Sequence, residues 1–174
     1  MTLTMIPSRQ ISAAALLFLA FAANAHAAEP TSLGAFEDWT AYTYKAPDTK
    51  VCYAVSQPKS SDSAKKVKRD PIFFIITNMP GRKIAGEVST IIGYPFKEQT
   101  TVNVKVDGTD FELFTNGDGA WADTAAKEKK IVTAMKTGKK FSVTGTSWKG
   151  TETTDNYSLN GLSQAIDKIN SACK

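Results

Sequence analysis

The sequence predicts a mainly β domain, either an antiparallel β-sandwich or a partly closed barrel, with two peripheral helices. From Trp39 to about Tyr157, short runs rich in β-branched and aromatic residues follow one another, separated by turn residues. The connections between the runs are mostly local, which is typical of antiparallel sheets. Pattern alone does not choose between the sandwich and the barrel.

Alternation of side chains predicts about eight strands. Val51, Tyr53 and Val55, for example, alternate with smaller residues, as in a strand with two distinct faces. The polar stretch 59–69 is predicted to be an exposed loop. The predicted strands fall in residues 39–44, 51–55, 71–77, 87–94, 102–106, 111–113, 141–148 and 153–159.

One predicted strand has no polar face. Every residue from Ile72 to Ile76 is apolar, and strands with this pattern are usually buried on both sides. The sequence therefore predicts a central strand that other elements cover on both faces.

The clearest local signal is a β-hairpin. Val102, Val104 and Val106 alternate with polar residues, and Asp107-Gly108 follows them. This dipeptide tolerates the positive φ angles of a two-residue hairpin turn, and the alternation resumes after it.

Two helices are predicted, over about 124–137 and 160–172. Asp123 or Thr124 can cap the first, and Gly138 lies where a left-handed C-cap would end it. In the second helix, apolar residues recur at steps of three and four and form one stripe that ends at Cys173.

The first 27 residues have the three parts of a secretory signal peptide. A polar segment with Arg9 precedes an apolar run over residues 11–23, which is shorter than the about 20 residues that span a bilayer. Ala25 and Ala27 supply the small side chains that a signal peptidase requires. We expect cleavage after Ala27, with Ala25 as the alternative. A single periplasmic or secreted domain, residues 28–174, would remain, and its sequence contains no membrane span.

Removal of this segment changes the inventory of reactive residues. The only histidine, His26, leaves with it, which excludes imidazole-dependent nucleophilic sites and His-ligated zinc. Arg9 also leaves, so 20 Lys+Arg remain against 17 Asp+Glu, a net charge of +3. This charge is too weak to indicate a nucleic-acid partner. The sequence predicts no catalytic residue, cofactor or metal site.

Cys52 and Cys173 are the only cysteines. An even number of cysteines in an oxidising compartment predicts a disulfide. A loop of this length is worth about 4 to 5 kcal/mol in the chain-entropy model. A redox or metal role is less favoured, since C-x-x-C spacing and histidine partners are absent.

Two other sets of residues are candidates for function. A pair of carboxylates across a cleft can hydrolyse a glycosidic bond, although acids are also common on turns for backbone reasons. Lys65, Lys66, Lys68 and Arg69 form a basic cluster that suits an acidic surface, such as anionic lipid headgroups or sulfated sugars; the alternative is a solvated face. The candidate carboxylates are Asp107, Asp110, Glu112, Asp118, Asp123 and Asp155.

Several motifs, taken together and in order, resemble one bacterial family. Trp39 and Val51-Cys52-Tyr53 begin the series. The later motifs are GYPFK (93–97), VKVDG (104–108), FELFT (111–115), GDGAWA (117–122), AMK (134–136), GTS (145–147), GT (150–151) and TTDNYSL (153–159).

Over essentially the whole predicted domain, the chain resembles the invasion-associated locus B family of Gram-negative bacteria. The resemblance implies an exported envelope protein, linked in the family's namesake to entry into host cells. It implies no enzymatic activity and no set of active-site residues.

The leading hypothesis is therefore a non-enzymatic binding module that contacts an envelope component or a host surface. One alternative is a carboxylate-dependent hydrolase of cell-wall or surface polysaccharide. The other is a structural or stress-protective envelope protein without a specific ligand.

Overall fold

The computed structural model describes residues 29–174, so the predicted signal peptide, residues 1–27, lies outside the described residues. The described chain forms one antiparallel sheet in the order β1-β2-β3-β5-β6-β9-β8-β7-β10-β11-β4, and the sheet is not closed. The strands are β1 (Thr31–Phe36), β2 (Trp39–Lys45), β3 (Lys50–Ser56), β4 (Ser60–Ser63), β5 (Phe73–Met79), β6 (Ile84–Ile91), β7 (Thr101–Val106), β8 (Thr109–Asn116), β9 (Gly119–Trp121), β10 (Lys140–Thr146) and β11 (Glu152–Ser158).

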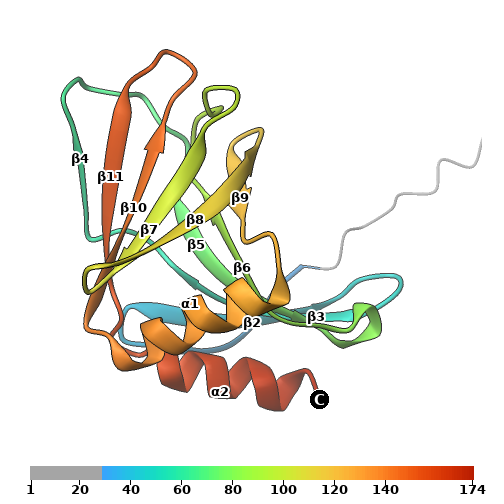
Figure 1. The fold of residues 1–174 in the computed structure, drawn as a ribbon. Helices are drawn as coiled ribbons and strands as arrows, with labels where there is room; N and C mark the ends of the chain where they lie inside the picture. The colour runs from blue at the N-terminus through green and yellow to red at the C-terminus, as the bar shows by residue number, and fades with distance from the viewer. Residues whose placement is uncertain (1–28) are drawn as a thin grey trace, which may run out of the picture.

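The sheet folds over on itself, so that its first half, which contains β2, β3 and β5, faces its second half, which contains β7, β10 and β11. An aromatic core lies between the two halves. The Trp39 ring on β2 stacks on Phe141 of β10 at 6.4 Å, and Phe74 of β5 meets Phe141 edge-on at 4.8 Å. The Trp39 indole N–H also donates to the Ser158 carbonyl oxygen at 3.1 Å. The mainly β prediction is confirmed, and the open, folded sheet combines features of the predicted sandwich and barrel (Figure 1).

Both predicted helices are present, as α1 (Ala125–Thr137) and α2 (Leu162–Ala172). They lie at the same end of the sheet (Figure 1). The Thr124 hydroxyl caps α1 by accepting the Lys127 backbone N–H at 3.2 Å. The predicted left-handed C-cap is wrong, because Gly138 has φ −82°. Space explains this glycine instead, since a Cβ there would lie 3.0 Å from Val106 Cγ1.

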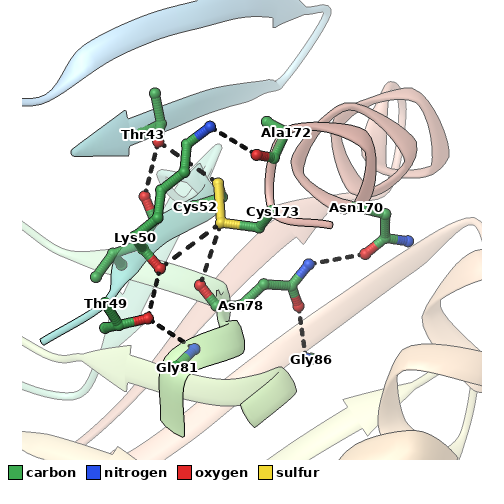
Figure 2. The surroundings of a disulfide bond; sticks show 11 residues. Thr43, Thr49, Lys50, Cys52, Asn78, Gly81, Gly86, Asn170, Ala172 and Cys173 are labelled. Carbon is green, nitrogen blue, oxygen red and sulfur yellow. Dashed lines mark hydrogen bonds between the residues drawn. A yellow bond between two sulfur atoms is a disulfide. The ribbon is translucent and has the colours of Figure 1, made fainter. Parts of the chain in front are cut away.

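The predicted disulfide between Cys52 and Cys173 is present, with 5.9 Å between the Cα atoms. Cys52 is fully buried on β3, and Cys173 follows α2 directly. Two polar contacts reinforce the link (Figure 2): Lys50 Nζ donates to the Ala172 carbonyl at 2.6 Å, and Asn78 Nδ2 donates to Asn170 Oδ1 at 2.8 Å. The last helix is thus fixed to β3 and β5.

Part of the predicted loop 59–69 is a strand. The four residues of β4 are exposed and pair with β11 at the edge of the sheet. Their composition has low strand propensity, and the pairing depends on distant residues: the Lys59 backbone N–H donates to the Asn156 carbonyl at 2.7 Å. β1 and β9 were likewise not predicted from the sequence.

The strand predicted to be covered on both sides is β5, and only its inner face is fully buried. Phe74 and Ile76 point into the core, whereas Phe73 and Ile75, on the outer face, remain half-buried. The prediction is wrong for this outer face. The apolar residues there are available for contact.

A short 3-10 turn, η1 (Pro80–Arg82), connects β5 to β6. Neither helix of residues 29–174 is long and apolar enough to cross a membrane.

Candidate binding face

The outer face of β2, β3, β5 and β6 carries a continuous set of aromatic and aliphatic side chains, here called the tyrosine face. Its residues alternate with the core residues of the same strands and so point away from the core. Most of them are half-buried. The tyrosine face consists of Tyr42, Tyr44, Val51, Tyr53, Val55, Phe73, Ile75, Thr77, Met79 and Glu87.

Three tyrosines support one another at the centre of this face. Tyr42 and Tyr53 are direct cross-strand partners, and their rings stack at 5.4 Å with 20° between the planes. Tyr44 meets Tyr53 edge-on at 6.3 Å and 71°. Such pairs gain about 0.5 to 1.5 kcal/mol beyond their burial, so the rings hold a defined arrangement.

The same row of side chains continues across the sheet to a carboxylate. Tyr53 of β3 pairs with Thr77 of β5, and Thr77 pairs with Glu87 of β6. Tyrosine and carboxylate therefore lie two strands apart in one line. A shallow groove of about 560 Å³ runs over them.

The charge of Glu87 is not balanced by an ion pair within residues 29–174. Burial raises its pKa, and nearby Arg82 opposes this increase. The Arg82 guanidinium is already bound to Asp48, with 2.8 Å between Nε and Oδ2. Glu128 on α1 adds repulsion, since Glu87 contributes to the raised pKa of Glu128 after burial itself. The groove thus contains a partly desolvated, unpaired carboxylate.

The other outer face of the sheet provides an internal comparison. There, Lys105, Ser142 and Asn156 form one row across β7, β10 and β11, and Asn103 and Thr144 belong to the next. This is the usual pattern for a strand face in contact with water. The outer face of β7, β10 and β11 is thus polar, whereas the outer face of β2, β3 and β5 is aromatic.

The structure separates the members of the predicted basic cluster. Lys65, Lys66 and Lys68 are exposed. The Arg69 side chain is only 9% exposed and forms an ion pair with Asp155, which is fully buried. Three lysines, without Arg69, are therefore presented to solvent.

Four of the six candidate carboxylates have clear structural contacts. Asp107 accepts the backbone N–H groups of the segment after α1, and Asp155 binds Arg69. Asp110 pairs with Lys105, and Asp123 pairs with Lys127 on α1. The Lys127 contact is the main cause of the lowered pKa of Asp123. The remaining two, Glu112 and Asp118, are exposed.

In the described part of the chain, no group of three His, Cys, Asp or Glu side chains is arranged to hold a metal ion.

The tyrosine face was missed from the sequence although its signal was present. Three neighbouring strands carry large apolar or aromatic residues on the face away from the core, as Tyr42, Tyr53 and Phe73 illustrate. In only one of these strands, residues 72–76, does the sequence predict coverage of the outer face, because strands with two apolar faces usually lie inside a domain. In this fold, the second half of the sheet covers the inner faces of β2, β3 and β5 and leaves their outer faces uncovered.

Comparison with protein families agrees with the resemblance seen in the sequence. The family model described as Invasion associated locus B (IalB) protein matches residues 39–170, which is most of the chain. This family is not a known enzyme family. Searches of curated proteins and of solved structures found no match. The matched region contains β2 through most of α2, including the whole tyrosine face. The chain therefore belongs to the invasion associated locus B family.

Proposed function

We propose that this protein is an exported cell-envelope protein that acts as a non-enzymatic binding module through its tyrosine face. The observation that carries the proposal is the half-buried aromatic groove on the outer face of β2, β3 and β5. Contiguous apolar surface rimmed by polar residues is characteristic of interaction sites, and tyrosine is enriched where proteins bind partners.

Two further features support export. The N-terminal segment has the composition of a signal peptide, and disulfides persist in oxidising compartments such as the periplasm. The partner in this proposal is a component of the envelope or of a host-cell surface.

The contacts of the candidate carboxylates support a binding role over the alternative of glycosidic hydrolysis. A glycosidase needs two carboxyl groups that face each other across the bond they cleave. Asp155 is enclosed by Arg69 and Ser61, and Asp107 and Asp123 hold the two ends of α1.

The test measures binding of the purified mature protein to isolated envelope fractions by co-sedimentation. We expect the double variant Tyr42→Ser/Tyr53→Ser to lose most of the binding. The matched control, Asn103→Ser/Thr144→Ser, changes two side chains of the polar outer face and should bind as the unmodified protein does. Equal binding by both double variants, each shown to be folded by circular dichroism, would rule out the tyrosine face as the contact surface.

We also propose that Lys65, Lys66 and Lys68 provide a second contact, with an acidic surface of anionic lipid headgroups or sulfated sugars. Their exposure supports this role. Such a contact weakens with salt. Neutralising all three with glutamine should therefore reduce the salt dependence of envelope binding, and an unchanged salt dependence would exclude the lysines.

A further inference from the structure

The charge of the tyrosine face, together with its aromatic rings, indicates what chemistry it would bind. Glu87 lies in the groove without an ion-pair partner among the described residues. A carboxylate that loses water without gaining a cation costs free energy. A positively charged group brought by a partner would recover that cost.

The tyrosine rings favour the same kind of group. Arginine and lysine are attracted to the faces of aromatic rings. The planar guanidinium of arginine also stacks on them and forms paired hydrogen bonds with carboxylates. The aliphatic stem of either side chain packs on apolar surface, which Val55, Ile75 and Met79 supply here.

The groove extends beyond the space of one side chain. A second hollow of about 450 Å³ shares Tyr42, Val55 and Phe73 with it and continues toward Glu37. Glu37 is exposed and has no ion pair in the described chain, whereas its neighbour Asp38 is paired with Lys59 at 2.7 Å. A second unpaired carboxylate thus lies along the same path, which suits a polypeptide with several basic residues better than a single small cation.

The net charge of the mature chain opposes the binding of a cationic partner. Residues 28–174 carry 20 Lys+Arg against 17 Asp+Glu, a net charge of +3, so long-range electrostatics repel a cationic partner. Attraction to such a partner has to come from a specific site.

We propose that the tyrosine face holds a cationic segment of a partner polypeptide, with an arginine or lysine side chain lying over Tyr42 and Tyr53 and its charged end at Glu87. This inference rests on the proposed function. It adds the chemistry of the partner to the binding role.

The test uses a fluorescently labelled oligo-arginine peptide and the mature protein, with binding measured by fluorescence anisotropy at physiological ionic strength. We expect Glu87→Gln and Tyr53→Leu each to weaken binding about tenfold. Glu112→Gln removes one exposed acid from β8, on the other half of the sheet, and should change binding less than about twofold. Circular dichroism and urea unfolding establish that each variant is folded.

Absence of binding by the unmodified protein, or equal weakening by Glu87→Gln and Glu112→Gln, would overturn the inference. Displacement of the peptide by choline at equal affinity would overturn it as well, because the site would then recognise a small cation. Any of these outcomes overturns only the cationic partner, and the proposed function remains supported, if the Tyr42→Ser/Tyr53→Ser variant still loses envelope binding. If that variant also binds envelopes normally, both proposals fail.

Discussion

Arg69 and Asp155 form a bidentate ion pair inside the folded sheet, with Nη1–Oδ1 at 2.7 Å and Nη2–Oδ2 at 2.5 Å. Arg69 lies in the segment between β4 and β5, whereas Asp155 is on β11. The Ser61 hydroxyl donates to Asp155 Oδ1 at 2.6 Å, and Arg69 Nε donates to the Ile92 carbonyl at 2.8 Å. The pair therefore fixes the connection that crosses from one half of the sheet to the other.

Asp155→Asn should destabilise the fold by about 3 to 5 kcal/mol, because it leaves the buried guanidinium without a counter-charge. The measurement is urea unfolding monitored by circular dichroism. Asp110→Asn is the matched control, since it breaks the half-exposed Lys105–Asp110 pair and should cost less than about 1 kcal/mol. Similar losses in the two variants would show that Arg69 is compensated by water or by the backbone.

Removal of the disulfide by Cys52→Ser/Cys173→Ser should cost about 4 to 5 kcal/mol, because the unfolded chain regains the freedom of a loop with a sequence separation of 121 residues. The same urea experiment measures it, and unmodified protein unfolded with reductant serves as the control. Coinciding unfolding curves for the double variant and the oxidised protein would contradict a stabilising role.

Gly161→Ala should be far more destabilising than Gly150→Ala, although both glycines have positive φ. A Cβ on Gly161 would lie 1.8 Å from the Phe36 carbonyl oxygen, whereas a Cβ on Gly150 meets nothing within 4 Å. Gly150→Ala should cost only the conformational penalty of about 1 kcal/mol. Thermal unfolding checks the comparison, and equal melting temperatures would mean that the start of α2 readily moves away from β1.

Local sequence signals predicted the regular elements well. The Asp107-Gly108 turn joins β7 to β8 with positive φ at both residues, as expected for a two-residue hairpin. The helices and the disulfide also follow from local spacing and from cysteine number. These features depend on neighbours in the sequence or on chemistry that one residue type carries.

Features that depend on distant contacts were missed. Nothing in the sequence around Arg69 indicates that its side chain is buried in an ion pair with Asp155 of β11 and is therefore not exposed beside the three lysines. Likewise, the apolar character of Phe73 and Ile75 predicts burial, but the sheet folds so that its second half covers only the opposite face. The candidate binding face thus became visible only from the topology.

Export predicts that the mature protein begins at Ala28. The expected result is an intact mass, measured on protein purified from its native host, that corresponds to residues 28–174 with two fewer hydrogens for the disulfide. Recombinant protein made without residues 1–27 is the mass standard. Native protein that retains Met1 would contradict cleavage.

Glu87→Gln should stabilise the fold at neutral pH and have almost no effect in acid. Burial raises the pKa of Glu87 in the folded state above its ordinary value of 4.5. At pH values between the ordinary pKa and the folded-state pKa, the folded protein therefore binds more protons than the unfolded protein. The corresponding stability is fully present below the ordinary pKa and is lost as pH rises through the folded pKa. Glutamine carries no charge and avoids that loss.

The melting temperatures of Glu87→Gln and the unmodified protein, compared at neutral pH and below about pH 4, measure this difference. Repulsion between Glu87 and Glu128 adds to the expected gain, because Glu87→Gln removes one of the two charges. Loss of the attraction between Glu87 and Arg82 reduces the gain. Glu112→Gln, which removes an exposed carboxylate from β8, is the control and should leave the melting temperature nearly unchanged at neutral pH. A gain that persists in acid would assign the effect to packing. A gain confined to neutral pH would mean that the chain retains a costly charge in its groove, as expected where a side chain serves binding at the expense of stability.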